Sequence, residues 1–314
     1  MKTKMKQIKI SFLMAAHNED KIIAKTLENF LKLPYDNFEV IIGLDGCTDN
    51  TEKIVKDYCE KSKKITYYKL NLRQGKNAVI NFIIKKATGE VCIINDADWI
   101  FTVKDSKILQ EFISVFNNKN IGGIAESFPV EWEPEKIKRG NIGYKMVAYS
   151  SYYWLKFQKE KYGTIKNNLR FLKKPTMFLT NVFRRKLYKE NLSLGDDFER
   201  TGHIMEEGYD VVLFDNLDFP RMIAVYDGVK VKDLFKLKIR TAIAREQLKK
   251  GQRVKERAYY FNSVFFMIKE SFKSGVSVGM IVVVWTLLTS IATLFSRFRK
   301  EDTKSGWRLR ATRK

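Results

Sequence analysis

Residues 91–100 read VCIINDADWI, an apolar run that leads directly into two aspartates separated by one residue. A short, uninterrupted apolar run is typical of a strand that is covered on both faces. In an extended backbone residues i and i+2 face the same side, so Asp96 and Asp98 can present their carboxylates to one point in space. Such a pair favours a bound cation. Taken alone, the same residues also suit a turn or a helix cap.

Strands and helices alternate around this stretch. We expect strands at residues 8–16, 38–44, 65–70 and 91–95, with helices at residues 19–32, 49–58 and 76–86. Asp49 and Glu52 have the spacing of a capping box for the second helix. The alternation predicts an α/β fold with a mostly parallel sheet and helices on both faces.

Polar residues follow each predicted strand, and sheets of this kind bind ligands beyond the carboxyl ends of their strands. The clusters at residues 17–19, 45–46, 73–76 and 96–98 should therefore line one crevice. The Gly-rich phosphate motifs G-x-G-x-x-G and G-x-x-x-x-G-K-[ST] are both absent from the sequence. Mg²⁺ or Mn²⁺ is the expected substitute, because such an ion takes one or two carboxylates and completes its shell with water and phosphate oxygens.

Composition limits the classes of function. The chain has 314 residues, 45% of them hydrophobic, and a formal net charge of +22, which indicates a polyanionic neighbour such as nucleic acid, anionic lipid or a phosphorylated substrate. Cys47, Cys59 and Cys92 form no CxxC pair, so we expect reduced thiols rather than disulfides or a zinc site. The apolar part of the N-terminus is too short for a secretory signal and fits the first strand better.

Three segments together resemble the nucleotide-sugar-binding half of the family 2 glycosyltransferases, whose fold is the Rossmann-like GT-A domain. They are LMAAHNEDKIIAKTLENFL (13–31), FEVIIGLDGCTDNTEKIV (38–55) and LRQGKNAVINFIIKKATGEVCIINDADW (72–99). The chain departs from the family's usual residues at Ala15, His17 and Leu44.

The resemblance implies roles for residues of this half. Asp98 would ligate the metal ion that bridges the diphosphate, and Asp96 would support the metal or the ribose. Four further residues would hold the donor, two at its base and ribose and two near its nucleoside: Glu19, Asp45, Arg73 and Lys76.

Residues 194–215, LGDDFERTGHIMEEGYDVVLFD, resemble the segment in which the family places its general base. Displacement at an anomeric carbon needs a carboxylate that accepts the proton of the acceptor hydroxyl. Asp197 matches that position, while Asp196 stands where glutamate is usual and His203 where arginine is frequent. As an alternative, the two aspartates suit the N-terminus of a helix, where negative charge is favourable.

Residues 236–251, KLKIRTAIAREQLKKG, resemble the family's arginine-containing segment that closes on the diphosphate. Arg240 occupies the arginine position, and a guanidinium group suits phosphate oxygens by bidentate hydrogen bonding. The family's Gln-x-x-Arg-Trp motif is incomplete here.

The C-terminal region predicts contact with a membrane. We expect a glycosyltransferase domain over residues 1–254, with a donor half (1–100) and an acceptor half (101–254), and a core helix over the aromatic-rich residues 143–157. An interfacial helix should follow at 255–274, a transmembrane helix at 275–295 and a basic tail at 296–314. Basic segments flank the apolar helix on both sides, which conflicts with a single span under the positive-inside rule.

These features predict an inverting, metal-dependent glycosyltransferase at the cytoplasmic face of the cell membrane. The donor would be a UDP or GDP sugar, and the acceptor a polyprenyl phosphate type lipid or a glycan. Three alternatives remain open: a polysaccharide synthase, a nucleotidyltransferase, and a non-enzymatic basic protein that binds nucleic acid or membrane. A synthase usually has several membrane spans, and recognisable nucleic-acid-binding modules are absent, so we expect membrane lipids rather than nucleic acid as partners. The sequence indicates no oligomeric state.

Overall fold

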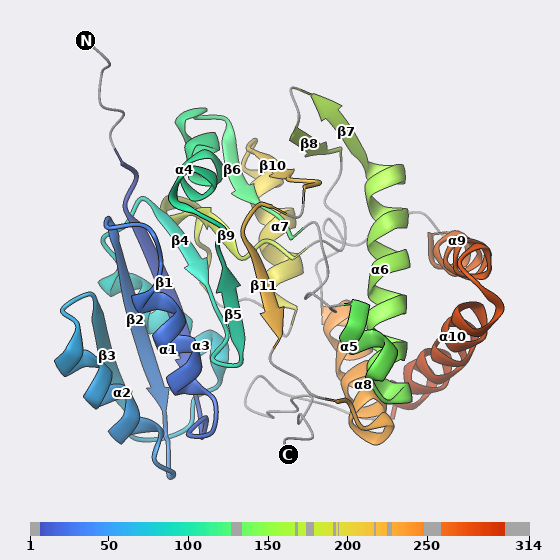
Figure 1. The fold of residues 1–314 in the computed structure, drawn as a ribbon, viewed down its shortest axis with the longest axis horizontal. Helices are drawn as coiled ribbons and strands as arrows, with labels where there is room; N and C mark the ends of the chain where they lie inside the picture. The colour runs from blue at the N-terminus through green and yellow to red at the C-terminus, as the bar shows by residue number, and fades with distance from the viewer. Residues whose placement is uncertain are drawn as a thin grey trace.

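The computed structural model describes residues 7–126, 134–166, 169–173, 179–190, 193, 195–216, 218–224, 228–247 and 259–298. Within them nine strands form one sheet in the order β3-β2-β1-β4-β9-β6-β10-β8-β7 (Figure 1). In chain order these are β1 (Ile10–Ala16), β2 (Phe38–Asp45), β3 (Ile65–Leu70), β4 (Val91–Ile94), β6 (Ile121–Ile124), β7 (Gly163–Lys166), β8 (Leu169–Leu172), β9 (Val182–Arg184) and β10 (Asp210–Leu213). The predicted α/β class and the first four predicted strands are confirmed.

The strands β3, β2, β1 and β4 are parallel neighbours, and β6 pairs in parallel with β10. Between these two parallel blocks lies β9, antiparallel to both β4 and β6. The strands β8 and β7 extend the far edge in antiparallel pairing. The parallel block places the carboxyl ends of its four strands at one edge of the sheet, where the predicted polar clusters begin.

Helices cover both faces of the sheet, and β1 shows why its sequence is apolar throughout. Ile10, Phe12 and Met14 pack in one cluster with residues of α1 (Ile23–Leu31), α2 (Thr51–Lys61) and α4 (Ser106–Ser114). Leu13 and Ala15 face the opposite cluster, which contains residues of α3 (Lys76–Ile83) and α7 (Asp196–Glu206). Alternating side chains of one strand therefore fill two cores.

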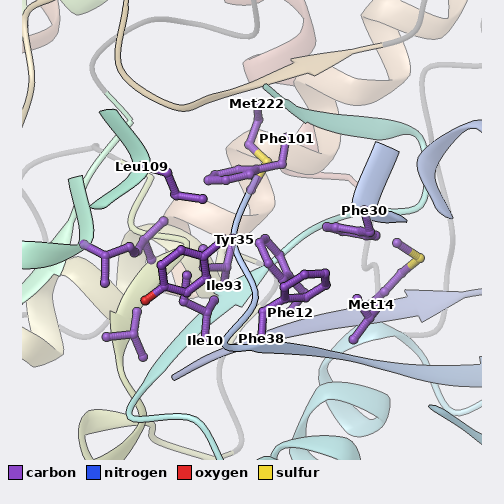
Figure 2. Close-up of a cluster of buried hydrophobic side chains, with 14 of the residues drawn as sticks. Ile10, Phe12, Met14, Phe30, Tyr35, Phe38, Ile93, Phe101, Leu109 and Met222 are labelled. Carbon is purple, nitrogen blue, oxygen red and sulfur yellow. The ribbon is translucent and has the colours of Figure 1, made fainter. Parts of the chain in front are cut away.

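Phe12 lies at the centre of the first cluster (Figure 2). Its ring centroid is 4.6 Å from that of Phe30 and 5.4 Å from that of Phe101. Phe101 belongs to β5 (Trp99–Thr102), which directly follows the two aspartates and pairs with β11 (Arg221–Ala224) in a separate antiparallel sheet. The sequence patterns did not predict this second sheet.

The starts of two helices differ from the predictions. The helix α1 begins at Ile23 because residues 19–22 form a turn in which Glu19 O accepts from the N–H groups of Ile22 and Ile23. The predicted capping box is wrong, since α2 has no side-chain cap and Glu52 instead pairs with Lys69 at 2.7 Å. The Asp49 carboxylate accepts from the backbone N–H of Thr51 at 2.9 Å.

A group of helices lies beside the sheet on the far side of β10 and β8 (Figure 1). It contains α5 (Pro134–Arg139), α6 (Ile142–Tyr162), α8 (Val231–Gln247), α9 (Tyr259–Lys273) and α10 (Val276–Ser296). The aromatic-rich segment forms the predicted helix, and α6 buries Tyr144, Tyr153 and Phe157. Short 3₁₀ turns complete the secondary structure at Ile84–Lys86, Val115–Asn117 and Arg185–Leu187.

The three cysteines are free thiols, as expected. Cys92 lies on β4 and is fully buried, and burial raises the pKa of its thiol to about 12. It therefore acts as a core side chain.

We expect Phe12→Ala to lower the free energy of unfolding by about 3–5 kcal/mol, because it removes a buried ring and leaves a cavity. Urea denaturation followed by tryptophan fluorescence measures the loss. Phe82→Ala is the matched control, since Phe82 is 40% exposed on α3 and its removal should cost about 1 kcal/mol or less. Equal losses for both variants would show that Phe12 is not central to the core.

Candidate active site

An acid cluster with a lysine at its centre lies beyond the carboxyl end of β4. Lys76 is the first residue of α3, and its Nζ is 2.9 Å from Oδ1 of Asp96. Asp196 and Asp197, the first two residues of α7, also act on Lys76 electrostatically. Burial alone would lower the pKa of Lys76, but the three carboxylates outweigh it and raise the pKa above its ordinary value. Lys76 is therefore a fixed positive charge among these acids.

The position of Lys76 depends on Asp45, the last residue of β2. The Asp45 carboxylate accepts hydrogen bonds from the backbone N–H of Gln74 at 2.6 Å and of Gly75 at 2.9 Å. Gly75 has a φ of +92°, which a residue with a side chain rarely adopts, and α3 starts directly after it. Asp45 thus holds the loop that delivers Lys76, while Arg73 in the same loop is exposed.

Arg200 anchors Asp196. Arg200 is 1% exposed, and its guanidinium donates to Oδ2 of Asp196 at 2.8 Å and to the Thr180 carbonyl at 2.9 Å. Burial would raise the pKa of Asp196, but the charges of Lys76 and Arg200 hold that pKa below its usual range. Asp196 is thus a charged, oriented carboxylate. No sequence motif indicated a role for Arg200, although its i,i+4 spacing from Asp196 on a predicted helix is typical of an ion pair.

Asp197 has the opposite electrostatic character. Burial and the neighbouring Asp196 charge raise the pKa of Asp197 to about 6. Its Oδ1 accepts from the backbone N–H of Phe198 at 2.9 Å. Two adjacent carboxylates whose pKa values move apart are the usual arrangement of an acid–base site. Asp197 can accept a proton near neutral pH.

Glu126 joins this cluster from the end of β6. Its Oε1 accepts from Asn181 Nδ2 at 2.9 Å. Burial raises the pKa of Glu126 to about 8, with further contributions from Asp197 and Asp96, so the group is mostly protonated at pH 7. No motif around Glu126 pointed to the site, because its proximity to Asp96 and Asp197 depends on how distant strands pair.

Two polar side chains hold the turn that carries Asp96 and Asp98 by donating hydrogen bonds to backbone carbonyls. Thr26 Oγ1 of α1 donates to the Ala97 carbonyl at 2.6 Å, and Asn95 Nδ2 donates to the carbonyls of Asp96 and Trp99. Asp98 is 9% exposed. The expected turn chemistry is thus present, and the same turn orders both aspartates.

The chemistry of the donor set is compatible with a divalent ion. In the part of the chain that the structure describes, no group of three or more His, Cys, Asp and Glu side chains could hold a metal by itself. Mg²⁺ and Mn²⁺ do not need such a group when substrate phosphates complete their shell. Asp98 and Asp96, which share this turn, are the residues that would hold such an ion, and Asp96 also pairs with Lys76.

The remaining predicted residues lie in two places. Glu19 is 8% exposed, and its backbone N–H donates to Thr51 Oγ1 at 2.7 Å. His17 Nδ1 contacts the Asp45 carbonyl at 2.5 Å, which ties the end of β1 to the end of β2. Arg240 lies on α8, whose main packing partners are α10 and α6. The structure therefore brings Lys76 together with Asp96, Asp196 and Asp197, whereas Arg240 belongs to the helical group.

Known proteins share this arrangement of elements. A mannosyltransferase from Pyrobaculum calidifontis, solved with GDP-Man and Mn²⁺, matches with a TM-score of 0.60 at 16% identity, over 95% of this chain and 89% of that one. The poly-beta-1,6-N-acetyl-D-glucosamine synthase of Staphylococcus epidermidis is 37% identical over 91 residues, which are 29% of this chain and 22% of the synthase. The probable glycosyltransferase YdaM of Bacillus subtilis is 30% identical over 132 residues, 31% of its length.

The chain thus spans less than a third of the length of these two relatives. A family model gives a longer match. The model of glycosyl transferase family 2 matches residues 11–192, more than half of the 314 residues, and includes β1 to β4, the Asp96–Asp98 turn and β9. The chain belongs to glycosyl transferase family 2.

Proposed function

We propose that this protein is an inverting, metal-dependent glycosyltransferase. It moves a sugar from a nucleoside diphosphate to a lipid-linked or glycan acceptor at the cytoplasmic face of a membrane. The family membership supports the reaction class. The observation that carries the mechanism is the pairing of Asp197, whose pKa is raised to about 6, with the charged Asp196 beside Lys76 and Asp96.

Asp197 takes the proton of the acceptor hydroxyl as the hydroxyl oxygen attacks the anomeric carbon. Asp196 is held by Arg200 and fixes the start of α7. Its negative charge favours the protonated form of Asp197, which helps Asp197 to accept the proton. One base and one attack invert the configuration of the anomeric carbon.

The donor is held by residues of the first four strand ends. Glu19, Asp45 and Arg73 would lie around the nucleoside, and Lys76 would contribute positive charge for the diphosphate. Arg240 would add charge for the diphosphate from α8 in the helical group, not from a strand end. Asp98 and Asp96 would hold Mn²⁺ or Mg²⁺, which supplies charge neutralisation to the departing diphosphate when it is bound.

Two donor sugars are candidates, N-acetylglucosamine and mannose. The synthase relative is named for a polymer of N-acetyl-D-glucosamine, and the structural neighbour was solved with GDP-Man. A thermal-shift screen of UDP- and GDP-sugars with and without Mn²⁺ distinguishes them, because a ligand that binds the native state raises the melting temperature.

Polysaccharide synthesis is a second candidate, favoured by the 37% identity to the synthase. In the described residues, one helix is long and apolar enough to cross a membrane, whereas a channel for a growing chain needs several. Mass spectrometry of the product decides, since transfer of a single sugar excludes processive synthesis.

We expect Asp98→Ala to abolish Mn²⁺-dependent stabilisation by the donor and to lower turnover by about 10²-fold or more, because the leaving group loses its metal. Thermal shift and product formation measure the two effects. Asp57→Ala is the control, since Asp57 is exposed on α2. Metal-dependent donor binding that survives in Asp98→Ala would remove Asp98 from the site.

Asp197→Asn should bind the donor normally and lose about 10²–10⁴-fold in kcat, since the amide cannot accept the proton. Single-turnover kinetics with saturating donor test this directly. Near-normal turnover would mean that another group is the base.

The turnover rate should rise with pH through about 6 and level off above it, because Asp197 acts in its deprotonated form and burial with Asp196 raises its pKa. In Asp196→Asn the neighbouring charge is absent, so the pKa of Asp197 falls and the acid limb moves to lower pH. Donor binding measured over the same range is the control. If the acid limb of the pH–rate profile lay at the same pH in Asp196→Asn as in the wild type, the coupling of the two carboxylates would be contradicted.

A further inference from the structure

The helix α10 has two distinct faces. It carries no charged residue over Val276–Ser296, and its most apolar window has a mean hydropathy of 2.2. Large apolar side chains are exposed at intervals of three or four residues along one face, namely Val276, Met280, Val284, Leu287, Ile291 and Leu294. We refer to these six residues as the outer stripe. The opposite face buries Gly279, Val282, Ala292 and Ser296.

The buried face is packed against the glycosyltransferase domain along its length. Val282 clusters with Tyr153 of α6, and Trp285 packs beside Tyr144 of the same helix. Farther along, Ala292 clusters with Ile239 and Ile243 of α8. The helix α10 is thus a layer on the domain rather than a separate anchor, and it lies outside α6 and α8, away from the sheet (Figure 1).

The helix α9 repeats this two-sided pattern. Met267 packs with Tyr153, and Glu270 pairs with Lys156 of α6 at 2.9 Å, whereas Phe261 and Phe265 are 74% and 63% exposed. A turn at Gly275, with a φ of +135°, joins α9 to α10. Both helices of this hairpin therefore turn apolar side chains away from the domain.

A spanning orientation of α10 conflicts with these contacts. The neighbouring α8 carries Lys232, Asp233, Lys236, Lys238 and Arg240, and Lys238 Nζ lies 4.6 Å from the Trp285 ring. If α10 crossed a bilayer, this charged helix would enter the hydrocarbon beside it, where such side chains are costly. With α10 in the membrane plane, α8 stays on the aqueous side.

We propose that α9 and α10 seat the protein on an anionic bilayer, with α10 lying in the membrane plane and both of its ends on the same side. Lys269 and Arg297 are exposed at the borders of the apolar faces, where lysine and arginine bind acidic headgroups. Lys273 is exposed there too, and its Nζ pairs with Glu270 at 2.6 Å. One-sided docking also accounts for basic sequence on both sides of an apolar helix. The proposal rests on the membrane location given in the proposed function, but donor binding at the sheet edge does not depend on it, so the two can fail separately.

Cysteine accessibility tests the orientation in the full-length chain. Lys273→Cys and Phe298→Cys are placed separately at the two ends of α10 in a Cys47→Ser, Cys59→Ser background, and a membrane-impermeant maleimide is added. We expect both cysteines to resist labelling in intact spheroplasts and to react in inside-out vesicles. Labelling of either position in intact spheroplasts would demonstrate a span and overturn the proposal.

The outer stripe is tested by flotation with vesicles of phosphatidylcholine containing about a quarter phosphatidylglycerol. Leu287→Asp with Ile291→Asp should weaken binding by roughly tenfold or more, because two apolar side chains that the membrane would cover become charged. Ile165→Asp is the control, since Ile165 is 64% exposed on β7. Thermal shift with donor verifies that each variant is folded. If the wild-type protein did not float with the vesicles, the proposal would be overturned. Dimerisation through the outer stripe in solution would then assign this face to a second copy of the chain.

Discussion

Carboxylates that are packed together at one edge of a sheet require compensating positive charge, and two residues supply it here. Lys76 faces Asp96, Asp196 and Asp197 from the start of α3, and Arg200 binds Asp196 from within α7. Without these cations the acids would repel one another and become protonated. The candidate site therefore depends on where two helices begin.

The placement of these cations makes two adjacent aspartates unequal. The charges of Lys76 and Arg200 lower the pKa of Asp196, whereas burial and the charge of Asp196 raise the pKa of Asp197 to about 6. The difference between the two pKa values therefore depends on burial and on the positions of Lys76 and Arg200. It provides a proton acceptor without any histidine in the cluster, and His203 interacts instead with Glu207 at 3.9 Å.

Helix α6 connects the helical group with the core of the sheet. The helix α6 packs against α9 and α10 on one side, and its Leu155 joins the core that α3 and α7 also share. Packed side chains of α6 therefore connect α9 and α10 with the core beneath the elements that carry Lys76 and Asp197.

Local periodicity and the residues that end each element were enough to predict β1 to β4, the helices between them and the two aspartates after β4. Tertiary structure decided the insertion of β9, the pairing of β5 with β11 and the roles of Arg200 and Glu126. It also decided which face of α10 is covered. These features depend on partners distant in the chain, and neither strand pairing nor the burial of a charge can be read from one segment.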